Sequence, residues 1–203
     1  MAEQSYLRQS PLAHLALDAR AVAEPGDAGV TMAERRFRGV VGLRGRADDA
    51  AFMTAAKTTL GYALPTEANT SAGNDASGAL WLGPDEWWIV TPGDGAAMAE
   101  TLQVGLGDAF CAVTDLSESR TCIRVIGPAA RDLLAKGCPL DLHPRVFAPG
   151  RCTRTVLAKA AVCVHQVSDA PGYEVYVLRS FADYLWRWLE DAAQEYGLAV
   201  LRG

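Results

Sequence analysis

The sequence predicts an α+β fold made of two fused ferredoxin-like halves, each with the order strand, helix, strand, strand, helix, strand. The same order of apolar, strand-like segments and helical segments occurs twice along the chain, with Gly and Pro residues at many of the boundaries. The chain has 203 residues, half of them apolar, which is enough for one substantial core or two small fused cores. We therefore expect antiparallel sheets with helices on one face of each sheet.

The first half is delimited by turn and capping residues. Asp48 is a suitable N-cap for a helix that Gly61 would end, and Gly83, Pro84 and Asp85 lie between the segments ALWL and EWWIV, as in a β-hairpin. The expected elements are a strand at 37–45, a helix at 48–60, strands at 79–82 and 86–90, a helix at 96–106 and a strand at 109–113.

The second half repeats this order. Pro128 suits the first turn of a helix that Gly137 ends, and three prolines exclude regular structure from the loop at 138–150. The expected elements are a strand at 121–127, a helix from 128, three valine-rich strands at 152–159, 161–167 and 173–178, a helix from 180, and a short strand in LAVL at 198–201.

The last helix has the clearest periodicity. Ser180 and Asp183 are spaced like an imperfect capping box, and an apolar stripe follows helical spacing. Trp186 falls about 120° from the centre of this stripe, at 100° per residue, so it is expected outside the core that holds Trp188. It would face a partner or lie under a neighbouring loop. The stripe consists of Phe181, Tyr184, Leu185, Trp188, Leu189, Ala192 and Tyr196.

We expect one domain over 1–203, with lobes at about 35–115 and 120–203 and an extended amino-terminal segment at 1–34. The formal charge is −5, and Lys and Arg are scattered, which argues against nucleic acid as a partner. No apolar run approaches the length of a membrane span, so a cytoplasmic location is predicted. The five cysteines form no C-x-x-C pair and are expected to be reduced, mostly buried thiols.

Catalytic signatures are absent from the sequence. It contains no dinucleotide, phosphate-loop, zinc-protease or nucleophile-elbow motif. Cys138 follows the end of a helix, where the dipole disfavours a thiolate, and is expected to be structural. Asp115, Asp141 and Asp85 are expected to form turns. His143 is expected to cap its loop, with a partner contact as the alternative, and His165 is expected to be a satisfied histidine of the sheet or core.

Long strings of the sequence resemble the gamma subunit of heterotetrameric sarcosine oxidase. They are SPLAHL at 10–15, ALWLGPDEWWIV at 79–90, TDLSESRTCIRVIGPAARDLLAKGCPLDLHP at 114–144, FAPGRCTRTVLAKAAVCVHQ at 147–166 and SFADYLWRWL at 180–189. The segment DLSESRTCIRVIGPAARDLL is also similar to a stretch of folate-binding aminomethyltransferases. The resemblance implies a fold like the folate domain of those enzymes.

The resemblance implies an accessory, non-catalytic subunit without a cofactor or metal site of its own. Its partners would be alpha, beta and delta subunits, which would hold FAD, FMN, NAD, tetrahydrofolate and zinc. The complex would be a flavin-dependent oxidoreductase acting on CH–NH donors, converting sarcosine to glycine with oxygen and tetrahydrofolate. Two alternatives stay open: a freestanding folate-binding one-carbon protein, and the equivalent subunit of an oxidase for another N-methylated amino acid.

Interface residues can be proposed from the sequence. Adjacent residues of a strand point to opposite faces, so one of Trp87 and Trp88 must leave the core that the other enters, and it would be covered by the other lobe or by a partner. The proline-rich loop loses little entropy on binding. The candidates for the partner interface are Trp186, Trp87, Trp88, Leu140, Leu142, His143 and Phe147.

Overall fold

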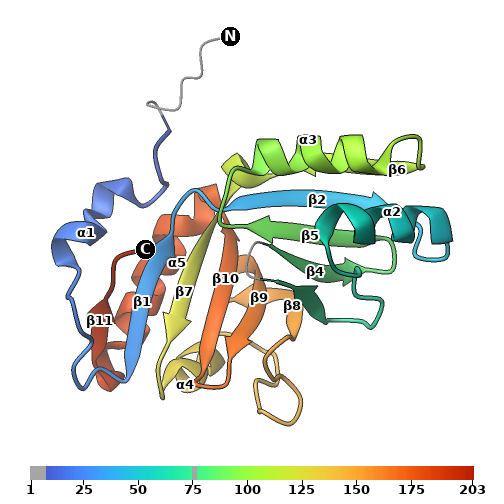
Figure 1. The fold of residues 1–203 in the computed structure, drawn as a ribbon. Coiled ribbons are helices and arrows are strands. Elements are labelled where there is room, and N and C mark those ends of the chain that lie inside the picture. Colours follow the sequence, from blue (N-terminus) through green and yellow to red (C-terminus); the bar gives the residue numbers. More distant parts are fainter. Residues whose placement is uncertain (1–7, 75–76) are drawn as a thin grey trace.

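Two mainly antiparallel sheets face each other, and helices cover the outer face of each (Figure 1). The computed structural model describes residues 8–74 and 77–203. One core lies between each sheet and its helices, and a third group of mainly apolar side chains, the apolar inter-sheet group, lies between the sheets. It consists of Val40, Leu80, Trp88, Val90, Cys122, Cys152, Cys163 and Tyr176. This layered arrangement confirms the predicted α+β fold with two ferredoxin-like halves.

The first half forms the five-stranded sheet, in the order β3-β4-β5-β2-β6. Leaving out the edge strand β3, its order is that of a ferredoxin-like unit. Asp49, rather than Asp48, caps α2, and its Oδ1 accepts hydrogen bonds from the amides of Ala51 and Phe52 at 2.9 and 3.2 Å. The elements are β2 (Gly39–Gly45), α2 (Ala50–Leu60), β3 (Ser71–Gly73), β4 (Gly78–Gly83), β5 (Glu86–Thr91), α3 (Gly95–Leu106) and β6 (Cys111–Asp115).

The second half forms the six-stranded sheet, in the order β11-β1-β7-β10-β9-β8. The strands of this half run antiparallel from β7 to β8, with β10 between β7 and β9. Its elements are β7 (Arg120–Ile126), α4 (Ala130–Ala135), β8 (Cys152–Leu157), β9 (Ala160–Ser168), β10 (Gly172–Leu178), α5 (Ala182–Ala192) and β11 (Leu198–Val200).

The amino-terminal segment contributes a strand to this second sheet. After the short helix α1 (Leu17–Arg20), β1 (Val30–Arg35) inserts between β7 and β11. Met32 is opposite Val125 in the antiparallel pair and Val200 in the parallel pair. Residues 30–34, expected to lie outside both lobes, therefore belong to the carboxy-terminal one. The sequence does not predict the strand VTMAER, because a glutamate is typical of a solvent-exposed position, whereas Glu34 is buried in the structure.

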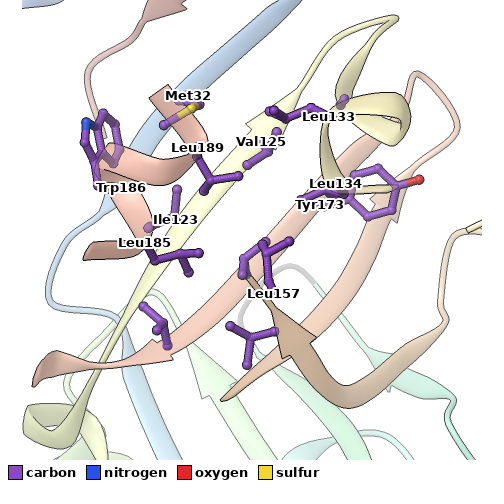
Figure 2. Close-up of a cluster of buried hydrophobic side chains, with 14 of the residues drawn as sticks. Met32, Ile123, Val125, Leu133, Leu134, Leu157, Tyr173, Leu185, Trp186 and Leu189 are labelled. Carbon is purple, nitrogen blue, oxygen red and sulfur yellow. The ribbon is translucent and has the colours of Figure 1, made fainter. Parts of the chain in front are cut away.

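Helix α5 buries a different stripe from the one predicted. Its buried residues follow i, i+3, i+4 and i+7 from Ala182 to Leu189 and include Trp186. Leu185 and Leu189 lie beside Ile123 and Val125 of β7 (Figure 2). Trp188 is partly buried against the same cluster, so the expectation that the two indoles cannot share a core is wrong. The predicted capping box does not form either, since Phe181 is the N-cap, without a side-chain bond, and Asp183 pairs with Arg187. Contact with the sheet fixes the rotation of the helix.

The adjacent tryptophans of β5 enter different layers. Trp87 is buried in the core under α2, 6.1 Å from the Phe52 ring, and its Nε1 donates to the Pro65 carbonyl at 2.8 Å. Trp88 lies between the sheets, with its ring 6.2 Å from that of Tyr176. The two lobes therefore cover both faces of β5.

Candidate functional site

Charged and polar side chains gather between the two sheets at one end of the apolar inter-sheet group. We call Arg38, Arg124, His165, Glu174 and Tyr176 the inter-sheet polar cluster. Four of them lie on β7, β9 and β10, on the face turned toward the five-stranded sheet, and Arg38 directly precedes β2. Because residues two apart in a strand share a face, Glu174 and Tyr176 point into the same layer.

Glu174 is the centre of this cluster. Its side chain is 2% exposed, and its Oε1 accepts a 2.6 Å hydrogen bond from Arg124 and lies 3.2 Å from the Arg38 guanidinium. The Tyr176 hydroxyl donates to the other carboxylate oxygen at 2.7 Å. A buried carboxylate needs such partners, since an unpaired charge in the interior is strongly destabilising.

The electrostatics of the cluster favour an ionised Glu174. Burial disfavours the charged form, but Arg38, the Tyr176 hydroxyl and Arg124 outweigh it and lower the pKa of the Glu174 carboxyl. Burial, with Cys122 and Glu174 nearby, raises the pKa of Tyr176 well above its ordinary value. The hydroxyl therefore stays protonated and acts as a donor. This arrangement holds the sheet together and leaves little capacity for proton transfer.

His165 borders a cavity of about 270 Å³ beside the cluster. Ser71, Arg38, Arg124 and Glu174 also line this cavity. The His165 Nε2 lies 3.0 Å from the Ser71 hydroxyl, and its buried Nδ1 has no hydrogen-bond partner in the described part of the chain. Burial lowers the pKa of His165 to about 4, so the imidazole is neutral at neutral pH. His165 therefore lies in the sheet as expected, but it is half-buried, and its unpaired Nδ1 departs from the expectation of a satisfied histidine.

The buried thiols are poor nucleophiles. Cys122, Cys152 and Cys163 lie in the apolar inter-sheet group, and burial is the main cause that raises the pKa of each, to about 12 for Cys152. Cys138 is 8% exposed, with its Sγ 3.9 Å from the Thr155 hydroxyl. Since the thiolate is the reactive form, the three inter-sheet cysteines act as small apolar residues.

The aspartates expected in turns bond to backbone groups close to them in sequence. Asp115 Oδ1 accepts hydrogen bonds from the amide and hydroxyl of Ser117 at 2.9 and 2.5 Å, and the Ser117 hydroxyl in turn accepts from the Val40 amide at 3.0 Å. Asp141 accepts from the His143 amide at 2.9 Å, while His143 Nδ1 accepts from the Arg145 amide at 3.2 Å. These contacts confirm the local bonding expected of Asp115 and Asp141, and they agree with a loop-capping role for His143.

The predicted interface residues mostly lie inside the chain. The interface prediction is therefore corrected for Trp186, Trp87 and Trp88, which are 0%, 0% and 5% exposed, and for Leu142 and Phe147, which are both 4% exposed. Leu140 is half-buried against the core of the second lobe, and His143 remains exposed. The sequence could not reveal this burial, because it depends on how the lobes and the proline-rich loop fold back on the sheets.

Sequence reasoning missed the Arg–Glu centre of the cluster. The available signal was a glutamate in the middle of the apolar strand GYEVYVL, where a solvated carboxylate has no place. Within residues 8–74 and 77–203, no group of three or more His, Cys, Asp or Glu side chains could hold a metal ion. None of the helices described is long and apolar enough to cross a membrane.

Comparisons with known proteins agree on one family. The profile described as sarcosine oxidase, gamma subunit family, matches residues 44–195. The curated sarcosine oxidase subunit gamma of Corynebacterium sp. (strain U-96) is 36% identical over 201 residues, covering 98% of this chain and 96% of that protein. The protein of the same name from Arthrobacter sp. is 37% identical over 199 residues, covering 96% and 94%.

Solved structures extend the likeness to the fold. A chain of heterotetrameric sarcosine oxidase from Corynebacterium sp. U-96, determined in complex with pyrrole 2-carboxylate, superposes with a TM-score of 0.84 at 36% identity, over 95% of this chain and 98% of that one. The glycine cleavage system aminomethyltransferase T from Bartonella henselae gives a TM-score of 0.66 at 17% identity, over 96% and 59%. The second match concerns the fold alone and confirms the aminomethyltransferase-like architecture.

Proposed function

We propose that this chain, which belongs to the sarcosine oxidase gamma subunit family, serves as the gamma subunit of a heterotetrameric sarcosine oxidase and contributes by assembly. The observation that carries this proposal is the end-to-end match to a chain of such an oxidase, in both sequence and fold. The match leaves no large segment of either chain unaccounted for. Because this chain shares the whole fold of that oxidase chain, we expect it to occupy the same position in a complex of the same kind.

The chemistry of the inter-sheet polar cluster supports a non-catalytic role. Glu174 is held by two guanidinium groups and a hydroxyl, so it is a weak base. The pKa of His165 is about 4, far from the value that suits a general base at neutral pH. The inter-sheet thiols are protonated and buried. None of these groups is prepared for acid–base or nucleophilic catalysis.

We place the redox and one-carbon chemistry in the other subunits. In this proposal alpha, beta and delta chains bind the flavins, nicotinamide dinucleotide, tetrahydrofolate and zinc, and the reaction converts sarcosine to glycine. The cavity beside His165 measures about 270 Å³, just below the range of about 300–1,000 Å³ that is usual for small-molecule sites. Its charged lining residues Arg38, Arg124 and Glu174 pair with one another, which favours a structural gap over a folate site.

Co-expression tests the proposal. The four chains are produced together and separately with the gamma chain omitted, and the products are analysed by size-exclusion chromatography with flavin absorbance. We expect a flavin-containing complex that includes the gamma chain and produces hydrogen peroxide from sarcosine, and we expect loss of assembly when the gamma chain is omitted. Dimethylglycine and N-methylproline serve as comparison substrates. A gamma chain that elutes alone and binds tetrahydrofolate would contradict the accessory role.

A further inference from the structure

A second pocket, of about 200 Å³, opens at the other end of the inter-sheet layer. Its centre is the Trp88 ring, which two guanidinium groups approach. The Arg120 Cζ lies 4.5 Å from the ring centroid and the Arg154 Cζ lies 5.7 Å from it. We call Trp88, Arg120 and Arg154 the arginine pocket. Cations over the face of a tryptophan are held by the ring quadrupole, so these side chains are fixed before any partner arrives.

The arginine pocket carries unbalanced positive charge. Arg154 pairs with both carboxylate oxygens of Glu86, and Arg44 pairs with the same carboxylate at 2.9 Å. Arg120 forms no ion pair within residues 8–74 and 77–203, its Nε is buried without a hydrogen bond, and the only hydrogen bond of its guanidinium there is a 3.3 Å contact with the Ser119 hydroxyl. One carboxylate thus faces three guanidinium groups. Burial and the charge of Arg154 lower the pKa of Arg120, and the nearby Cys163 and Glu86 offset this only in part.

Exposed apolar side chains surround the pocket on the same face of the six-stranded sheet. Leu178 is directly opposite Arg120 in the β10–β7 pair, and Val156 is directly opposite Ala161 in the β8–β9 pair. Leu178 is 39% and Val156 47% exposed, whereas Cys152, on the same face of β8 as Val156, is fully buried under the other sheet. The five-stranded sheet therefore leaves this end of the face uncovered.

We propose that the arginine pocket binds an acidic side chain of a partner subunit, with apolar residues beside that side chain covering Leu178 and Val156. The planar guanidinium of Arg120 matches a carboxylate in two-point geometry. Arginine and tryptophan at the centre of a contact, with apolar side chains around them, are the usual composition of an interface hot spot. This inference rests on the proposed function, because the partner is another subunit of the oxidase.

The test measures the dissociation constant of the gamma chain from the assembled four-chain complex, by dilution at low and at moderate salt. We expect Arg120→Gln to raise this constant at least about tenfold and to weaken its salt dependence. Arg120→Lys keeps the positive charge but loses the planar two-point geometry of the guanidinium, so it should give an intermediate dissociation constant. Arg46→Gln is the matched control, because Arg46 pairs with Asp48 at an exposed site and both side chains are 71% exposed.

The outcomes separate this inference from the proposed function. Equal constants for the wild type, Arg120→Gln and Arg46→Gln would overturn the arginine pocket as a contact while leaving the gamma assignment intact. A wild-type chain that does not assemble would overturn the proposed function itself. Thermal unfolding of each variant shows whether it is folded. A further experiment titrates acetate into the isolated chain and monitors binding by NMR. If Arg120→Gln abolishes acetate binding but leaves assembly unchanged, the pocket binds a free carboxylate ligand and not a side chain of a partner subunit.

Discussion

Arg124 and Glu174 are directly opposite each other on β7 and β10, and their side chains form a 2.6 Å hydrogen-bonded ion pair between the two sheets. Arg38, which directly precedes β2 in the first lobe, reaches the same carboxylate at 3.2 Å. One buried anion therefore ties the two lobes together. A cross-strand pair of opposite charges favours this register, and Arg38 adds a contact between lobes that apolar packing alone would not orient.

Replacing this carboxylate should destabilise the chain strongly. In Glu174→Gln two guanidinium groups lose their counterion in a buried site, and we expect the free energy of unfolding to fall by about 3 kcal/mol or more. Urea denaturation of the isolated chain measures the change. Glu118→Gln is the control, because the Glu118 side chain is 62% exposed and its ion pairs with Arg8 and Arg179 should contribute little. Equal effects of the two substitutions would contradict the central role of Glu174.

Stability should decrease as the pH falls below about 6.5. The pKa of His165 is about 4 in the folded chain and near 6.5 when unfolded, so the unfolded chain binds the proton first and stability is lost between these two values. The loss from this group reaches about 3 kcal/mol at most. Chemical denaturation at several pH values should show it, and His165→Gln should flatten the curve between pH 6.5 and 4. The lowered pKa of Glu174 adds a further loss as the pH falls below 4.5.

Trp186 should behave as a core residue. Its side chain is fully buried in the core that α5 covers, together with Leu185 and Leu189. Trp186→Ala removes a large apolar volume, so we expect the free energy of unfolding to fall by about 3–5 kcal/mol. Thermal unfolding of the isolated chain provides the measurement. Phe181→Ala, at a position 40% exposed on the same segment, should cost much less. A stable Trp186→Ala chain that fails only in assembly would restore the interface interpretation.

Three residues that could attract a catalytic hypothesis should be dispensable for turnover. We expect Asp115→Asn, Cys138→Ala and His143→Gln, each in the assembled oxidase, to leave the rate of sarcosine oxidation nearly unchanged, because Asp115 and His143 make local turn contacts and Cys138 is packed in a core. Peroxide release per flavin is the measurement. A fall of about three orders of magnitude with assembly preserved is the scale of a lost catalytic group and would refute the non-catalytic role.

The sequence by itself determined the class of fold, the two repeated halves and most element positions. The hairpin at Gly83–Asp85, the end of α2 at Gly61 and the irregular loop at 138–150 follow from local chemistry, since Gly, Pro and capping residues act within a few positions of themselves. The long family-like strings likewise indicated the gamma subunit family. These features can be predicted without knowing which distant segments pack against them.

The tertiary structure decided which faces are buried. It placed β1 inside the second sheet, rotated α5 so that Trp186 enters the core, and covered both Trp87 and Trp88 with the two lobes. It also brought Arg38, Arg124 and Glu174 together from positions far apart in sequence, and left Arg120 without an ion pair in the described part of the chain. Burial and charge pairing depend on what packs opposite a residue, and periodicity within one element cannot specify that opposing surface.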